Sequence, residues 1–268
     1  MQRRLARFFS RLRTARSRGK TGLGEMSLLE HLEELRRRLI WCLVAVGVAT
    51  IVGFVFSDYL MRWLLLLVTE IPGVTIQAIE IPEKFATSLR LSLIAGIALA
   101  MPVIVYQVWG FFRPGLLPQE RVYLRVGLPM VILFFAGGMT FSYFLALPAA
   151  LRFLLQFGTA DVVTQPQLQP FLTFVATLLL WSGISFELPI LLFFLAKVHV
   201  VDWRRLSKWR KYAFLIICIV AAVITPTPDP VNMMIIAVPL YLLYEIGILL
   251  ARLAARPVSR PAEEGIDE

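Results

Sequence analysis

Glu187 is the residue whose surroundings in the sequence point most directly to chemistry. It is the only ionisable residue between Pro170 and Ala196, an apolar stretch long enough to cross a membrane. A charged side chain at the bilayer centre costs about 2.5 to 3.5 kcal/mol on insertion scales, so such residues face a protein interior and mark function. Pro189 cannot donate to the Ser185 carbonyl, which leaves a second polar group nearby. The sequence therefore predicts a polar, kinked site inside the membrane.

A second group of acids precedes the first apolar stretch. Glu33 and Glu34 each lie four residues before an arginine, Arg37 and Arg38 respectively. Such pairs stabilise a helix surface by a few tenths of a kcal/mol each. From this segment alone, a solvated, salt-bridged helix face is the favoured interpretation of these glutamates.

The other reactive residue types give little indication of chemistry. Glu245 lies near the expected inner membrane surface, where a structural role is favoured. Cys42 and Cys218 fall in apolar stretches and read as small core residues, so neither a disulfide nor a metal site is expected. His31 and His199 have no partners at ligand spacing, and no hydrolytic triad, P-loop or dinucleotide motif is visible. We expect no cofactor and no metal.

The elements that position these residues must be membrane helices. The 268 residues are 58% hydrophobic, above the approximately 45 to 50% of soluble domains, and the mean hydropathy is +0.74. Strands cannot satisfy their backbone alone in lipid, so each apolar stretch predicts a helix. The fold class is therefore all-α and polytopic. Six membrane-spanning helices are expected, at about 39–57, 91–112, 126–151, 170–196, 212–226 and 231–250.

These spans divide the chain into three parts. Residues 1–25 form a basic extension that we expect to be disordered, 26–252 a six-helix membrane domain, and 253–268 a tail. The net charge of +9 comes from Lys and Arg that gather in alternate loops, which places both termini in the cytoplasm and argues against nucleic acid as the partner. The Arg-rich start also has the composition of an organellar transit peptide, but a basic arm at the cytoplasmic membrane surface is favoured.

Local signals refine this organisation. Ser27–Glu30 reads as a capping box, and an apolar stripe from Leu28 to Leu39 predicts a helix lying in the membrane interface before the first span. The connection from Asp58 to Arg90 should fold over the outer surface as short helices. The last two spans are short and joined by a proline-rich turn from Thr225 to Pro230, which predicts an antiparallel hairpin and local bilayer thinning.

Several runs, taken in order, resemble the TatC family, the core subunit of the twin-arginine protein translocase. The runs are His31–Leu39, Tyr106–Leu116, Glu120-Arg121, Phe186–Pro189, Ile224–Asp229 and Pro239–Gly247, and they extend over residues 27 to 252. The resemblance implies six helices in a concave, cupped arrangement with both ends cytoplasmic. It also implies a protein that is not an enzyme, in a bacterial or archaeal plasma membrane rather than an organellar one.

The resemblance implies that the protein receives folded cargo whose signal peptide carries two consecutive arginines. Glu34 and Glu120 match the family's acids for that pair. A carboxylate can accept a guanidinium bidentately, so arginine should be favoured over lysine. Arg36, Phe111 and Arg121 match supporting positions, although packing of Phe111 against the membrane interface is equally open.

Further roles are also implied by the resemblance alone. Glu187 matches an intramembrane glutamate that contacts single-span TatA- or TatB-type subunits or the inserted signal peptide, and Asp229 matches the acid of an outer turn. The family's partners also include membrane lipid and further copies in a larger complex, and its energy source is the proton gradient. This chain departs from the family pattern in its long basic extension, in its Thr-Pro-Thr-Pro-Asp turn and at Met233.

Two other classes of function share some of these sequence features. Glu187, Glu245 and the proline-broken helices are also features of a proton-coupled secondary transporter, but no repeat relates the two halves and no polar cluster lies at the midplane. An intramembrane enzyme would need a paired carboxylate, His or Ser at recognisable spacing. The sequence contains no such pair near Glu187.

Overall fold

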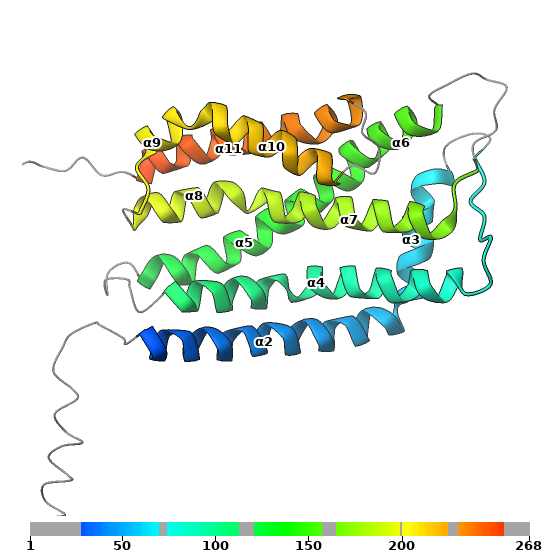
Figure 1. Cartoon of the computed structure of the whole chain (residues 1–268), viewed down its shortest axis with the longest axis horizontal. Coiled ribbons are helices and arrows are strands. Elements are labelled where there is room, and N and C mark those ends of the chain that lie inside the picture. The colour runs from blue at the N-terminus through cyan, green and yellow to red at the C-terminus, as the bar shows by residue number, and fades with distance from the viewer. Residues whose placement is uncertain are drawn as a thin grey trace, which may run out of the picture.

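The chain folds into a layered bundle of long helices (Figure 1). The computed structural model describes residues 28–69, 74–112, 121–156, 165–198, 200–224 and 230–254, and within these ranges no β-strand occurs. The predicted all-α class is confirmed. In chain order the elements are α2 (Leu28–Val55), α3 (Ser57–Thr69), α4 (Glu83–Phe112), α5 (Arg121–Phe141), the π-helical turn η2 (Ser142–Ala146), α6 (Leu147–Gln156), α7 (Leu168–Phe186), α8 (Leu188–Lys197), α9 (Trp203–Lys208), α10 (Arg210–Ile224) and α11 (Pro230–Ala254).

Among the described residues, five helical runs are long and apolar enough to cross a membrane. They are Glu30–Val55, Glu83–Phe111, Gly127–Leu155, Leu168–Lys197 and Met233–Ala254. The remaining predicted span, 212–226, corresponds to α10, whose 15 residues extend about 22 Å, less than the approximately 30 Å of a hydrocarbon core. α10 packs along α11 and is antiparallel to it (Figure 1). The start of α2 and the end of α11 lie at the same end of the bundle (Figure 1).

The first helix differs from its sequence-based prediction. The apolar stripe from Leu28 to Leu39 predicts a separate interfacial segment, but α2 is one uninterrupted helix that already includes it. Leu, Glu and Arg are all good helix formers, and no proline interrupts them. α2 packs mainly against α4, and residues on its other faces, such as Leu43 and Val48, are exposed. The polar first turns of α2 and the first membrane span therefore form one continuous helix.

α7 supplies the centre of the largest apolar cluster. Leu172 and Val175 are fully buried and pack with side chains of α3, α4 and α6. α5 approaches α7 so closely that a Cβ atom at Gly138 would come within 2.6 Å of the Ser182 carbonyl oxygen. This close packing fixes the helix that leads to Glu187.

The helix pair α7 and α8 is broken at Glu187. The Glu187 amide donates to the Ile184 carbonyl oxygen at 3.1 Å, and Pro189 occupies the first turn of α8. Proline is tolerated there because a first-turn amide needs no helical acceptor. The kink expected from Pro189 thus falls at the acidic residue itself.

A buried carboxylate joins two segments at the opposite end of the bundle. Glu83, at the start of α4, is 4% exposed and accepts hydrogen bonds from the backbone amides of Ile79 (2.6 Å), Glu80 (3.2 Å) and Gln169 (3.0 Å). Gln169 belongs to the first turn of α7. Glu83 therefore ties the connection before α4 to the start of α7.

Candidate functional site

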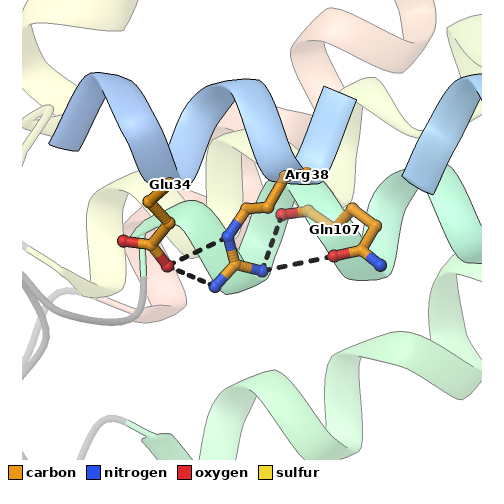
Figure 2. Close-up of polar contacts among 3 residues, drawn as sticks. All are labelled: Glu34, Arg38 and Gln107. Carbon is orange, nitrogen blue, oxygen red and sulfur yellow. Dashed lines mark hydrogen bonds and ion pairs between the residues drawn. The ribbon is translucent and has the colours of Figure 1, made fainter. Parts of the chain in front are cut away.

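Two helix faces meet near the start of α2 and the end of α4. His31, Glu34 and Arg38 are spaced by three and four residues, which places them on one face of α2. That face lies against the last turns of α4 (Figure 2). We call this contact the α2–α4 seam, formed by His31, Glu34, Arg38, Gln107, Gly110 and Phe111.

An ion pair on α2 forms the centre of the seam. Glu34 Oε1 accepts from Arg38 Nε at 3.0 Å and from Nη2 at 2.5 Å. Arg38 Nη1 reaches across to α4, where it donates to the backbone oxygen and to Oε1 of Gln107 at 3.3 and 3.4 Å (Figure 2). The Glu34 side chain is only 15% exposed and that of Arg38 19%. The pair is therefore shielded from water and holds the two helices together.

The second oxygen of Glu34 is without a donor. Oε2 is enclosed, and no hydrogen bond reaches it from the described residues. An enclosed acceptor that lacks a donor costs about 1 to 3 kcal/mol, and more when it is charged. A guanidinium or ammonium that reached Oε2 would recover this free energy.

An aromatic stack flanks the acid. The rings of His31 and Phe111 are stacked with centroids 4.2 Å apart and an angle of 24° between their planes. Because His31 lies three residues before Glu34, this stack is next to the carboxylate on the same helix face. Phe111 of α4 therefore packs against the face of α2 that carries Glu34.

Comparison with known proteins assigns the family. The family described as "Sec-independent protein translocase protein (TatC)" matches residues 30–239. The chain belongs to the TatC family. A TatC protein of Carboxydothermus hydrogenoformans is 37% identical over 227 residues, 85% of this chain and 93% of its own, and one of Deinococcus radiodurans is 40% identical over 252 residues, 90% and 92% respectively. A crystal structure of "Twin Arginine Translocase Receptor- TatC" superposes with a TM-score of 0.78 at 36% identity, covering 84% of this chain and all of that one.

Family membership makes the chain a TatC subunit of the protein translocase, which is not a catalytic enzyme. Its relatives are bacterial and its helices can cross a membrane, so it is a multi-pass protein of the bacterial plasma membrane. As a TatC protein it is part of the Sec-independent protein translocase. In the described part of the chain, no three His, Cys, Asp or Glu residues are grouped so as to hold a metal ion.

The described part of the structure does not place the predicted site residues Arg36, Glu120, Arg121 and Asp229 at the seam. Arg36 is exposed and lies two residues from Glu34, which puts it on another face of α2. Glu120 and Asp229 lie outside the described residues. Arg121 begins α5, but its side chain is also outside the described set.

Sequence reasoning missed three parts of the seam. The i,i+4 spacing indicates Arg38 only as a surface ion-pair partner of Glu34, and no spacing gives Gln107 or Gly110 a role. All three belong to runs that resemble the TatC family, so the resemblance was the signal that could have drawn attention to them. Only the contact between α2 and α4 shows that they act together.

Glu187 lies in a different environment from the seam. It stands at the break between α7 and α8, and its Oε1 is enclosed with no donor among the described residues. The neighbouring Ser185 cannot serve as a free donor, because its hydroxyl donates to the Trp181 carbonyl at 2.6 Å. Glu187 therefore has an unused hydrogen-bonding capacity inside the membrane.

Glu245 is fully engaged by its neighbours. Arg210 donates to it through Nε at 2.8 Å and through Nη2 at 2.9 Å, and the Tyr241 hydroxyl donates at 3.0 Å. These contacts tie the start of α10 to α11. The structural role favoured from the sequence is consistent with this arrangement.

Proposed function

We propose that the α2–α4 seam receives one arginine of a twin-arginine signal peptide, and that the chain thereby recognises folded cargo for export. The observation that carries the proposal is the enclosed Glu34 Oε2, which has no donor among the described residues. Arg38 already holds Oε1, so the carboxylate is fixed in place before any peptide arrives. A preorganised acceptor binds a cation with less loss of side-chain entropy than a mobile one.

This geometry refines how arginine is recognised. Two N–H groups of Arg38 already occupy Glu34 Oε1, so an incoming guanidinium would bond to Oε2 after the groups that enclose this oxygen move aside. The second arginine of the pair then requires another acid, for which the family resemblance suggests Glu120. A planar guanidinium can donate to Oε2 and to a second acceptor at once, whereas an ammonium is a point charge. Arginine is therefore preferred over lysine.

We also infer that Glu187 contacts a single-span TatA- or TatB-type subunit or the inserted signal peptide. Its enclosed Oε1 and its place at a helix break support this role, because a polar group from a neighbouring helix would satisfy the oxygen. Export then proceeds with these partners, driven by the proton gradient, and within a complex that contains further copies. By the family resemblance, we assign Asp229 to the outer turn.

The test is a binding measurement on the purified full chain in detergent. A peptide with an Arg-Arg pair and a matched peptide with Lys-Lys are titrated by calorimetry. Loss of one charge-assisted hydrogen bond costs about 1.5 kcal/mol, so Glu34→Gln should weaken Arg-Arg binding about tenfold or more. Glu120→Gln should weaken it as well.

Glu33→Gln is the matched control, because Glu33 is exposed on another face of α2. Glu33→Gln also removes one negative charge, at the adjacent position of α2. It should leave the affinity for the Arg-Arg peptide within about twofold of that of the unmodified protein. Equal affinity for both peptides, or equal losses in the Glu33 and Glu34 variants, would show that the seam is not the receptor site.

A further inference from the structure

The basic residues at the inner end of α9, α10 and α11 form a second candidate binding surface, separate from the α2–α4 seam. Five of them are exposed and make no ion pair within the described residues. We call them the α9 platform: Arg204, Arg205, Lys208, Lys211 and Arg252. Two nearby acids among the described residues already have partners, because Glu245 pairs with Arg210 and the Asp202 carboxylate accepts from the Arg204 amide at 3.3 Å.

The platform rests on a rigid support. The Tyr244 hydroxyl donates to the Leu206 carbonyl at 2.8 Å, and both residues are buried in the cluster that joins α9 to α11. The ion pair of Arg210 with Glu245 locks α10 to the same helix. The cations are therefore presented by ordered helices, so little entropy is lost when they bind an anion.

Two guanidinium groups share one aromatic ring. The Cζ atoms of Arg204 and Arg252 lie 5.6 and 5.2 Å from the centroid of the Trp203 ring. Each cation–π contact is favourable, and neither guanidinium forms an ion pair with a carboxylate of the described residues. A phosphate bound beside this ring would supply a negative partner for these cations and accept hydrogen bonds from a planar guanidinium.

Exposed aromatic side chains border the platform. Trp209 is 60% and Tyr212 55% exposed, and the Lys211 ammonium lies 5.2 Å from the centroid of the Tyr212 ring. Aromatic residues in such places mark the level of the lipid headgroups. We infer that the α9 platform binds the phosphate headgroup of an anionic phospholipid of the inner leaflet, with the acyl chains against Trp209 and Tyr212.

The experiment titrates the detergent-purified full chain with phosphatidylglycerol or phosphatidylcholine and counts bound lipid by native mass spectrometry. Basic residues near a membrane surface contribute about fivefold each to the binding of anionic lipid. We expect phosphatidylglycerol to bind at least tenfold more tightly than phosphatidylcholine. The variant Arg204→Gln/Arg205→Gln/Arg252→Gln should lose most of that difference.

The matched control removes three exposed cations from the opposite end of the bundle, as Arg62→Gln/Lys84→Gln/Arg90→Gln. This control should keep the preference. Lys208→Gln/Lys211→Gln leaves Trp203 and its partners intact, and it tests the same surface if the triple variant does not fold. Equal losses in the control and platform variants, no loss in any platform variant, or displacement of the lipid by excess inorganic phosphate would each overturn the inference.

Discussion

The Arg38 guanidinium occupies the space that a side chain at Gly110 would need. A Cβ atom built on Gly110 would collide with Arg38 Nη1, and Cζ would lie only 2.9 Å away. The last turns of α4 therefore fit around a charged group of α2. The position of the Glu34 carboxylate depends on a residue of another helix that it does not touch.

Gly110→Ala should therefore weaken peptide binding without removing any charged group. The new methyl group displaces the guanidinium, which loses its hold on Glu34 Oε1 or on Gln107. Loss of one such bond is worth about 1.5 kcal/mol, so Arg-Arg peptide affinity should fall about tenfold. Calorimetry on the purified variant measures this.

Gly47→Ala is the control for that experiment, because nothing lies within 4 Å of a Cβ atom at Gly47. It makes the same change within a helix and should leave affinity unchanged. Tenfold weaker binding in both variants would mean that the glycine near Arg38 has no special role.

Arg38→Gln should destabilise the protein and weaken peptide binding together. The change leaves both oxygens of a shielded carboxylate without a charged partner, and hydrogen bonds to charged groups contribute about 1.5 to 3 kcal/mol. The free energy of unfolding should fall by about that amount, as measured by denaturation in detergent. If Arg38 instead competed with the peptide for Glu34, the variant would bind the peptide more tightly.

Arg37→Gln provides the comparison for Arg38→Gln. Arg37 is exposed, and no ion pair joins it to Glu33 within the described residues. Its removal changes the net charge equally but should alter the free energy of unfolding by less than about 0.5 kcal/mol. A comparable loss of stability would point to net charge as the cause.

The sequence predicts local features of this fold well and contacts between helices poorly. The kink at Glu187 and the short α10 follow from Pro189 and from the length of one apolar stretch, both of which are local. The bond from Arg38 to Gln107 joins residues 69 positions apart, and no spacing rule relates them. In the sequence, only the TatC resemblance connects the runs His31–Leu39 and Tyr106–Leu116, to which these two residues belong.

The glutamate pairs before the first span show a similar limit. Spacing predicts an ion pair for Glu33 with Arg37 as strongly as for Glu34 with Arg38, yet the structure contains the second pair and not the first among its described residues. The difference is that α4 shields one face of α2 and leaves the other in solvent. The same packing makes the polar start of α2 part of the first span instead of an interfacial segment.

Glu83→Ala should be among the most destabilising single changes at the end of the bundle opposite the seam. The buried carboxylate accepts three backbone amides, and all three lose their acceptor together. Because the three amides lose a common acceptor, the free energy of unfolding should fall by more than the loss of a single hydrogen bond would cause. Thermal unfolding in detergent measures the effect.

Two variants show whether this loss comes from the three hydrogen bonds that the Glu83 carboxylate accepts. Glu83→Gln keeps an acceptor oxygen and should lose less stability than Glu83→Ala. Glu80→Ala removes an exposed acid from the same turn and should have little effect. If Glu80→Ala and Glu83→Ala lowered the free energy of unfolding equally, the hydrogen bonds to the Glu83 carboxylate would not contribute to stability.

Glu187→Leu should separate stability from export. The enclosed Oε1 has no donor among the described residues, so replacing the acid by an apolar side chain should raise the free energy of unfolding by about 1 to 3 kcal/mol. Export should fall, because the group that a neighbouring helix or an inserted peptide would contact is gone, while capture of the Arg-Arg peptide at the seam is unchanged. Ser185→Ala, whose hydroxyl is already bonded to Trp181, should leave export intact. Normal export by Glu187→Leu in cells would show that Glu187 has no role in transport. The acid would then only lower the stability of the fold.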